Sequence, residues 1–446
     1  MEYTYPDLHD CSISIIGLGY VGLPLAAQFA SIKESLINGK SLKRKVIGFD
    51  INKKRINELK RNFDRTFEVS EETLSELTGI NFVSDEDYLI ESDFFIITVP
   101  TPIDKNKKPD FSYLLSASKI FARAIKKRKK NSLPFVIFES TVYPGATREI
   151  CIPQIEDESG KELNKDFICG YSPERINPGD NSKTISKIKK VTSASNEEGS
   201  NLVDKLYASI IAAGTHMAPS IEVAEAAKVI ENIQRDLNIG LVNELSLLFS
   251  KLNISSKDVF DAACTKWNFH DFRPGLVGGH CIGVDPYYLT YKAEKHNFHP
   301  QLILSARRIN DNMSYWVVNK LIKIMCKSNI LIGKSKILIM GVSFKEDCND
   351  IRNSKVFDII NQLQEYNLDL SIYDPIVDLS EVYKTHKLTL IDKLDLKIKY
   401  DAILIAVGHK FFKEIDKQEW LEVRKRGTII YDLKGILSRE IDCLSL

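Results

Sequence analysis

Residues 12–31 read SISIIGLGYVGLPLAAQFAS, and they decide how the start of the chain folds. The β-prone run Ser12–Ile16 ends at Gly17, and apolar residues recur at helical spacing from Leu23 to Ser31. Between the two runs, Gly17, Gly19 and Gly22 form a GxGxxG pattern. In a dinucleotide-binding turn, the first glycine permits the tight turn, the second lets the backbone approach a pyrophosphate, and the third lets helix and strand pack closely. The pattern predicts such a turn, although a glycine-rich turn without a ligand would look the same.

The second predicted strand, residues 45–50, ends on an acid that favours NAD as the cofactor. A carboxylate at Asp50 would accept both ribose hydroxyls and repel a 2′-phosphate. Arg55 is the opposing signal, because an arginine there could accommodate NADP. The polar, basic segment 31–45 lengthens the spacing to Asp50, and we expect it to be a solvated extension. We expect the cofactor to contact Gly17, Gly19, Tyr20, Val21, Gly22, Asp50 and Arg55.

The hydrophobic pattern divides the rest of the chain into three parts. Further buried strands at 94–99 and 135–139 alternate with helices, which is typical of a parallel α/β sheet. Residues 220–252 then predict one long helix, suited to a spine or a dimer interface, with more helix at 255–263 and 302–326. After Lys334, strands at 336–340, 370–373, 402–407 and 428–431 restart the alternation, with a helix at 354–366. The fold class is therefore α/β, with an N-terminal Rossmann domain (1–215), a central helical domain (216–330) and a C-terminal Rossmann-like domain (331–446).

Composition excludes several classes of function. The formal net charge is +1, which gives no electrostatic reason to bind nucleic acid or an anionic membrane. No apolar run approaches the roughly 20 residues that a membrane-spanning helix needs. The first residues lack the pattern of a secretory signal. The eight cysteines are scattered without zinc-ligand spacing. We therefore expect a reduced, cytoplasmic protein without a metal.

The loop FRPGLVGGHCIGVDPYY, residues 272–288, is the strongest candidate for chemistry. Gly278 and Gly279 precede Cys281, and Asp285 follows it four residues later. A lone cysteine is commonly a small buried hydrophobe. This one stands in a Gly/Pro-rich loop beside a histidine, away from any apolar periodic face, so we interpret Cys281 as a nucleophile.

Four more candidates are ambiguous when taken singly. Lys228 and Asn232 lie one turn apart on the long predicted helix and share a face, but a helical lysine is normally a solvated charge. Glu174 in SPERINPGD and Thr141 in ESTVYPGAT follow predicted strands, where α/β enzymes usually place their sites.

Together the motifs closely resemble the UDP-glucose/GDP-mannose dehydrogenase family over nearly the full length. The matching stretches are GLGYVGLP (17–24), GFDIN (48–52), TVPTP (98–102), ESTVYPG (139–145), SPERINPG (172–179), Lys228 with Asn232, GGHCIGVDP (278–286) and GVSFKEDCNDIRNS (341–354). The resemblance implies an NAD domain, a helical dimerisation domain and a C-terminal domain that binds UDP.

The resemblance also implies a role for each matched residue. The implied catalytic residues are Cys281, Lys228, Asp285, Asn232, Glu174 and Thr141. Further implied cofactor contacts are Thr101, Thr141 and Arg352. The implied substrate contacts are Glu174, Arg175, Lys228, Asn232, Arg273, Gly278, Lys345 and Lys434. Arg273 lies in a loop that in this family can reach the neighbouring subunit, and Lys434 stands where many relatives carry arginine.

The implied reaction converts the 6-hydroxymethyl group of a UDP-sugar to a carboxylate in two NAD-dependent oxidations. Asp285 and Thr141 would position a water, and Lys228 with Asn232 would stabilise the oxyanion. Cys281 would form a thiohemiacetal and then a thioester, which Glu174 would help to hydrolyse. The loop text resembles the branch that acts on UDP-N-acetylglucosamine or UDP-N-acetylgalactosamine, for polysaccharide synthesis. UDP-glucose and UDP-N-acetylmannosamine stay as alternatives, and GDP-mannose fits least.

Two rival functions remain. A single-step β-hydroxyacid-type dehydrogenase would share the NAD domain and a lysine on the helical spine, but it would need neither Cys281 nor the last domain. A catalytically silent NAD-binding sensor or scaffold would be supported by loss of the cysteine or the lysine, and both are present. The long helix also favours a homodimer or a higher homo-oligomer.

Overall fold

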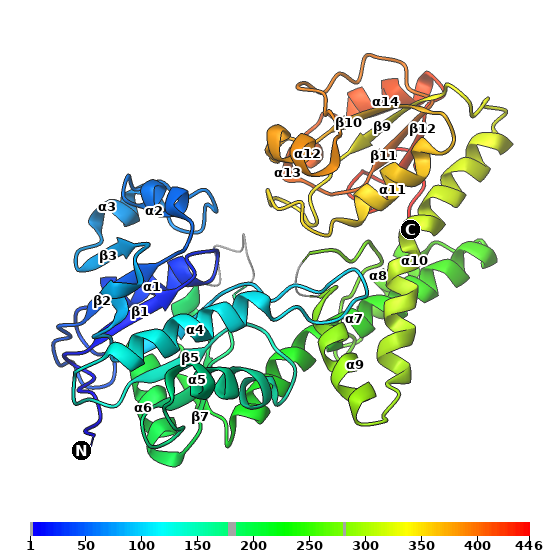
Figure 1. Ribbon diagram of the computed structural model, residues 1–446. Helices are drawn as coiled ribbons and strands as arrows, with labels where there is room; N and C mark the ends of the chain where they lie inside the picture. The colour runs from blue at the N-terminus through cyan, green and yellow to red at the C-terminus, as the bar shows by residue number, and fades with distance from the viewer. Residues whose placement is uncertain (1–2, 177–183, 280–281) are drawn as a thin grey trace. The chain divides into compact units, whose positions relative to one another are not determined.

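A computed structural model describes residues 3–176, 184–279 and 282–446 (Figure 1). The chain divides into two compact units, and the division falls inside one long helix. The first unit comprises Met1–Glu231 and Tyr287–Asn297, and the second comprises Asn232–Pro286 and Phe298–Leu446.

The first unit is built on an eight-stranded sheet. Its strands are β1 (Ser12–Ile16), β2 (Lys45–Phe49), β3 (Ile80–Val83), β4 (Phe94–Ile97), β5 (Phe135–Phe138), β6 (Ile168–Tyr171), β7 (Lys190–Ala194) and β8 (Thr215–Met217). Its helices are α1 (Gly22–Ser31), α2 (Lys53–Leu59), α3 (Glu71–Glu76), α4 (Ser112–Lys127), α5 (Ile152–Ser159), α6 (Glu197–Ala208), the start of α7 (Ile221–Leu252) and most of α9 (Asp285–Lys295), with short turns η1 (Glu86–Leu89), η2 (Thr147–Cys151) and η3 (Ile185–Lys187).

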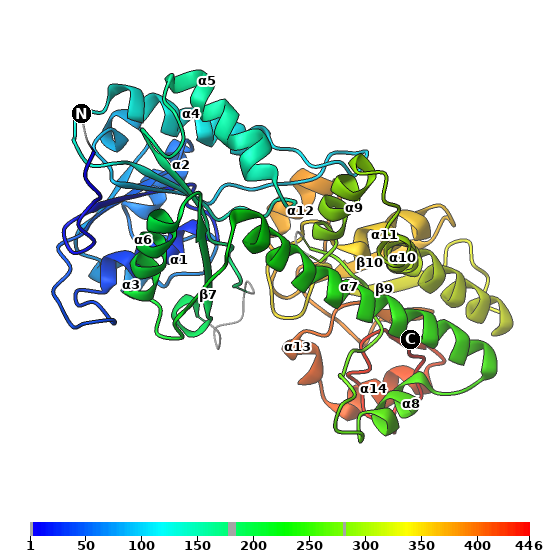
Figure 2. The same cartoon turned by 90° about the horizontal axis from the view of Figure 1, so that it is seen from below.

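The strand order is β3-β2-β1-β4-β5-β6-β7-β8, and the first six strands run parallel. β7 is antiparallel to β6. Strands β4 and β5 are buried on both faces, because α1 and α6 pack on one face and α4 with α5 cover the other (Figure 2). The continuous apolar strands FFII and FVIF satisfy both layers.

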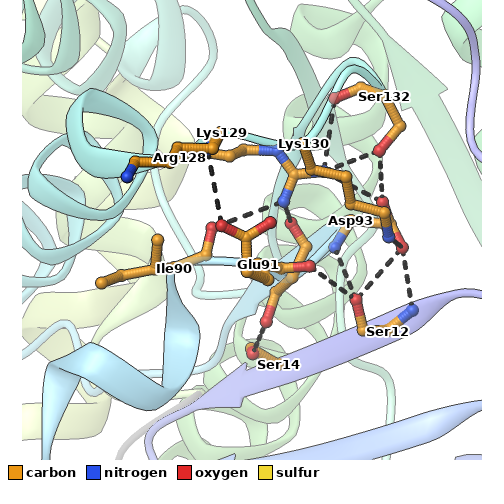
Figure 3. A network of polar contacts seen from close by, with 10 residues as sticks. Ser12, Ser14, Ile90, Glu91, Asp93, Arg128, Lys129, Lys130 and Ser132 are labelled. Carbon is orange, nitrogen blue, oxygen red and sulfur yellow. Dashed lines mark hydrogen bonds and ion pairs between the residues drawn. The ribbon is translucent and has the colours of Figure 1, made fainter.

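The amino ends of β1, β4 and β5 are joined by a polar network around Asp93 (Figure 3). The Asp93 carboxylate accepts hydrogen bonds from Ser12 N at 3.0 Å, Ser132 Oγ at 2.6 Å, Arg128 Nη2 at 3.0 Å and Lys130 Nζ at 2.5 Å. Sites in parallel sheets lie at the carboxyl ends of the strands. This network therefore holds the opposite edge together.

The second unit contains a four-stranded parallel sheet of order β10-β9-β11-β12. Its strands are β9 (Lys336–Met340), β10 (Asp369–Tyr373), β11 (Ala402–Ile405) and β12 (Ile429–Asp432). Its helices are the rest of α7, α8 (Ser256–Ala263), α10 (Gln301–Lys327), α11 (Lys355–Gln364), α12 (Leu379–His386), α13 (Lys410–Lys413) and α14 (Lys417–Lys425). Residues of α10 and α11 form the core on one face of the sheet, and α13 with α14 cover the other.

The structure confirms the predicted α/β class, with a helical segment between the two sheets in sequence. Two expectations need correction. The loop from 272 ends at Val284, because Asp285 is the first residue of α9. The segment 31–45 is also not wholly solvated: Leu42 and Arg44 are buried, and Arg44 Nε donates to Leu8 O at 2.8 Å. Within the described ranges, no helix is both long and apolar enough to cross a membrane.

Candidate active site

The turn between β1 and α1 has the geometry that a pyrophosphate requires. Gly17 has φ +97°, a backbone conformation that disfavours side chains. A Cβ on Gly22 would lie 1.9 Å from Gly17 O, so only glycine lets the helix start this close to the strand. A Cβ on Gly19 would meet nothing within 4 Å, so the backbone there faces open space. Tyr20 and Val21, half-buried, complete the turn before α1. The residues present thus fit a dinucleotide.

Asp50 follows β2 and is tied to this turn. Its Oδ2 accepts from Leu18 N at 3.0 Å, and its Oδ1 accepts from Asn52 N at 2.8 Å. The residue stays partly exposed, which leaves lone pairs of the carboxylate available to ribose hydroxyls.

Arg55 is only 5% exposed, and its charge is already matched. Its Nη2 lies 2.7 Å from Asp64 Oδ1, and its Nε donates to Leu18 O at 2.9 Å. A guanidinium paired with a buried carboxylate is a poor receptor for a second anion, because the pair is already neutral. This pairing supports NAD over NADP and places Arg55 beneath the glycine turn.

Thr101 and Thr141 come together from the loops after β4 and β5. Thr101 Oγ1 donates to Thr141 O at 2.7 Å, and both residues are half-buried. The loop beyond Thr141 is fixed to α7 by Glu225, which accepts from Gly145 N at 2.5 Å and Thr147 N at 2.9 Å. Lys228 follows Glu225 by one helical turn and is 9% exposed, so it is no solvated surface lysine.

Glu174 lies after β6 and is held on both oxygens. Its Oε1 accepts from Arg175 N at 2.5 Å and Ile176 N at 2.6 Å. Its Oε2 lies 3.0 Å from Lys190 Nζ. The Arg175 side chain turns away to Glu231 on α7, with Nη2 2.8 Å from Oε1.

In the second unit, Asn232 and Asp285 form a buried pair. Asn232 Nδ2 donates to Asp285 Oδ2 at 2.5 Å, and the two residues are 7% and 2% exposed. Sequence reasoning named both residues but gave no reason for them to touch. The contact sets the orientation of the Asn232 amide, because its nitrogen faces a carboxylate and its oxygen must point elsewhere.

Cys281 lies outside the described residues, but the glycines before it are well placed. A Cβ on Gly278 would lie 2.7 Å from Asn353 O, and one on Gly279 would lie 2.8 Å from the Phe344 ring. Asn353 Nδ2 also donates to Gly279 O at 3.3 Å. Gly278 and Gly279 therefore pack against the GVSFKEDCNDIRNS stretch, and only glycines permit that approach.

Four of the predicted substrate residues of the second unit line two hollows. Gly278, Lys345 and Lys434 line one, together with Phe344 and Leu276. Arg273 and Lys434 line the other, a cavity of about 220 Å³. Lys434 Nζ lies 2.8 Å from Glu346 Oε1, and Arg273 Nη1 lies 2.7 Å from Asp261 Oδ1. Arg352 lines neither hollow, and its Nη2 lies 2.5 Å from Asp350 Oδ2.

Sequence reasoning missed two buried residues that hold this edge of the second unit. Asn243 on α7 binds both backbone groups of Gly275, with Nδ2 to O at 3.0 Å and Oδ1 to N at 2.8 Å. His409 accepts from Asp347 N at 3.0 Å through Nδ1, so its Nε2 carries the proton toward Asp374 Oδ2 at 3.2 Å. The sequence signal that could have identified Asn243 and His409 is a polar residue within an otherwise apolar stretch.

Three family models match the chain in order. They describe the NAD binding domain (residues 11–211), the central domain (222–312) and the UDP binding domain (338–439) of one family. The chain belongs to the UDP-glucose/GDP-mannose dehydrogenase family. It is therefore an NAD-dependent oxidoreductase, and the resemblance noted from the motifs is confirmed.

Individual relatives match over the whole length. The chain is 48% identical to UDP-N-acetyl-D-glucosamine 6-dehydrogenase of Pseudomonas aeruginosa, across 98% of this chain and 100% of that protein. It is also 48% identical to Protein CapL of Staphylococcus aureus, across 96% and 97%. Among solved structures, UDP-D-ManNAc dehydrogenase from Pyrococcus horikoshii matches with TM-score 0.83 and 28% identity, across 97% and 98% of the chains.

Proposed function

We propose that this enzyme oxidises the 6-hydroxyl of UDP-N-acetyl-D-glucosamine to a carboxylate in two successive NAD-dependent steps, as part of polysaccharide synthesis. The observation that carries the choice of sugar is the 48% identity, over the full length, to a relative of that name. The archaeal UDP-D-ManNAc dehydrogenase shares only 28%. The sugar's C4 epimer, UDP-N-acetyl-D-galactosamine, differs by one hydroxyl and is the second candidate.

When bound, NAD supplies the hydride acceptor for each oxidation, and the chain supplies the remaining groups. The partly exposed Asp50 and the open backbone at Gly19 bind and orient the cofactor. The ammonium of Lys228 stabilises negative charge on the substrate oxygen, since a preorganised cation acts strongly in a site that excludes water. Asp285, oriented by Asn232, and Thr141 position the water that takes up the hydroxyl proton.

The second half of the reaction uses the cysteine loop. The Cys281 thiolate adds to the aldehyde carbon, and loss of the second hydride leaves a thioester. Glu174 then removes a proton from the attacking water, and the thiolate departs as the carboxylate forms. The contact of Gly278 and Gly279 with Phe344 and Asn353 supports this assignment, because it anchors the loop beside Lys345 of the UDP binding domain.

The enzyme assembles as a homodimer through α7. Five apolar side chains on this helix, Val223, Ile230, Leu241, Leu248 and Leu252, are 47–54% exposed. At about 100° per residue they fall within a stripe about 40° wide. An apolar stripe on a long helix is suited to burial against a second copy. Leu241→Glu should convert the dimer to a monomer in light scattering, whereas an unchanged mass would exclude this interface.

The decisive test measures NADH formed per sugar consumed, with limiting UDP-N-acetyl-D-glucosamine and excess NAD. UDP-N-acetyl-D-galactosamine, UDP-N-acetyl-D-mannosamine and UDP-glucose run in parallel. Two NADH per sugar, with the product lost in Cys281→Ala, would support the proposal. One NADH per sugar would exclude the thioester route, and a higher kcat/KM with another sugar would reassign the substrate. No NADH from any sugar would favour the sensor or scaffold.

A further inference from the structure

Glu174 contacts a cluster of buried ionisable groups, Glu139, Lys190 and Tyr207, to which the resemblance assigns no role. Lys190 Nζ lies 2.7 Å from Glu139 Oε2 and 3.0 Å from Glu174 Oε2. Tyr207 donates its hydroxyl proton to Glu139 Oε1. All four residues are at most 8% exposed, so the cluster is sealed from solvent on the side of the core.

The cluster lies at the sheet edge where parallel sheets place their sites. Glu139 directly follows β5, and Glu174 lies three residues beyond β6. Lys190 reaches the same edge because β7 is antiparallel to β6, so the first residue of β7 lies at the carboxyl end of β6. Tyr171 pairs with Ser193, and extending that register by three residues places Lys190 opposite Glu174.

The charges of the cluster are unequal. Two carboxylates face one ammonium, which leaves an excess of one negative charge when all three are ionised. Burial by itself lowers the pKa of Lys190, but the two carboxylates outweigh it and raise the pKa, so the ammonium persists at neutral pH. Burial raises the pKa of Glu139 to about 7. The Glu139 carboxyl is therefore partly protonated near neutral pH.

Stability alone does not account for this arrangement. Buried ion pairs are often matched or exceeded in stability by apolar residues of similar volume. Unlike Asp93 at the opposite edge, Glu174 also keeps acceptor capacity within the part of the chain that the structure describes. A carboxylate offers about four acceptor sites, and Arg175 N, Ile176 N and Lys190 occupy three. The fourth acceptor site of Glu174 thus lies on a carboxylate whose orientation is fixed by the other three contacts.

We infer that Lys190, held in place by Glu139, is a positioning residue for the second half of the reaction: it orients Glu174 to take a proton from the water that hydrolyses the Cys281 thioester. In this step the water oxygen bonds to the thioester carbon, one water proton passes to Glu174, and the carbon–sulfur bond breaks to release the thiolate. No electron transfer is involved. The inference rests on the proposed role of Glu174.

The test uses the full-length enzyme with saturating NAD and UDP-N-acetyl-D-glucosamine, or with the sugar that turns over fastest. In Lys190→Met we expect kcat to fall by about 100-fold, the lower range for loss of a general base. Both hydrides should still leave, giving a burst of two NADH per active site. Acid quenching and intact mass spectrometry should then show the sugar as an acyl adduct on the protein.

Hydroxylamine separates positioning from simple structural damage. It attacks thioesters without a general base, so it should restore turnover of Lys190→Met and yield the hydroxamate. The neighbouring Lys189 is exposed, and Lys189→Met is the matched control, with unchanged kcat and no adduct. If Lys190→Met does not fold, as judged by its melting temperature, Tyr207→Phe tests the same cluster. It should show the same adduct and a fall in kcat of about 10-fold, because it removes one hydrogen bond to a charged group.

The controls distinguish failure of this inference from failure of the proposed function. If Glu174→Gln accumulates the adduct but folded Lys190→Met and Tyr207→Phe do not, Lys190 has no positioning role and the proposed function stands. If Glu174→Gln turns over normally without an adduct, the role of Glu174 is wrong and the inference falls with it. If the unmodified enzyme makes no NADH from any UDP-sugar, the proposed function itself fails.

Discussion

The two parallel sheets begin with the same turn and use it differently. Gly17 directly follows β1 with φ +97°, and Gly341 directly follows β9 with φ +87°. In each, an aspartate after the neighbouring strand accepts the next backbone N–H: Leu18 N to Asp50 at 3.0 Å, and Val342 N to Asp374 at 2.7 Å. Asp50 remains partly exposed, whereas Asp374 is 5% exposed.

The two aspartates differ in how many hydrogen-bond acceptor sites they leave for a ligand. Asp374 also accepts from Ser343 N, Ile376 N, Val377 N and His409 Nε2, so its acceptor sites are filled from within the protein. α1 starts five residues after Gly17, whereas α11 starts only at Lys355. The first turn therefore presents its acid and helix end to a ligand. The second uses its acid to hold a long loop that carries Phe344 and Lys345.

The largest effect should come from breaking the first turn. Gly22→Ala places a Cβ 1.9 Å from Gly17 O, and we expect a loss of about 3 kcal/mol or more in the free energy of unfolding, with NAD binding abolished. Denaturant titration and NAD calorimetry measure both quantities. Gly19→Ala is the control: it should keep the melting temperature and lose NAD affinity. Equal stability of the two variants would mean that the turn is looser than described.

The two aspartates should respond in opposite ways to the same substitution. Asp374→Asn replaces a buried carboxylate whose acceptor sites are all used with an amide that has one acceptor oxygen. It should therefore lower the free energy of unfolding by about 3 kcal/mol without changing NAD affinity. Asp50→Asn should leave stability nearly intact and weaken NAD binding by about 2 kcal/mol, roughly 30-fold in Kd. Melting curves with and without NAD distinguish them. If Asp50→Asn destabilised the fold as much, the contrast between the two turns would be lost.

Substitutions of His409 test how the second turn holds the loop that carries Lys345. His409→Gln retains a donor near Asp374 but loses the acceptor for Asp347 N, which should cost about 1 kcal/mol. Because Lys345 lies on the loop so released, KM for the UDP-sugar should rise while kcat and KM for NAD change little. His409→Asn can keep the acceptor and serves as the matched variant. A fall in kcat alone, with KM unchanged, would contradict this role.

The smallest effect is a pH dependence of the stability that Asp374 gives to the second turn. Burial by itself raises the pKa of Asp374, but hydrogen bonds from His409 and from backbone N–H groups outweigh it and hold the pKa below 3.8. The stabilisation is therefore complete above about pH 4 and lost as pH falls through the lowered native pKa, because the unfolded chain takes up the proton first. The stability gap between wild type and Asp374→Asn should therefore narrow as pH falls below about 4. A constant gap would mean that Asp374 is not ionised in the fold.

Periodicity and glycine spacing predicted the α/β class and the long helix, because these depend on local sequence. The stretch 12–31 folds as predicted, with α1 starting one residue earlier than the apolar pattern, at Gly22. What could not be predicted is contact between distant segments. In sequence, Lys190 is only a charged residue at the end of a strand, and its position near Glu174 follows from the antiparallel pairing of β7 with β6. Arg55 suggests a phosphate-binding residue in sequence, but in the structure Asp64 neutralises its charge. The pairing of Asn232 with Asp285 likewise depends on where α9 begins.

The two hydrogen bonds between Asn243 and Gly275 have a consequence for how the loop from residue 272 to 284 responds to ligands. One buried side chain takes both hydrogen-bonding groups of the Gly275 backbone, and Asn310 Oδ1 lies 2.8 Å from the same Asn243 nitrogen. The Gly275 amide should consequently exchange its hydrogen as slowly as the amides of α7 and α10. Because Gly275 is held in place, the parts of the loop before and after it should move as two independent short segments. Ordering the side that carries Arg273 then transmits little to the side that carries Gly278.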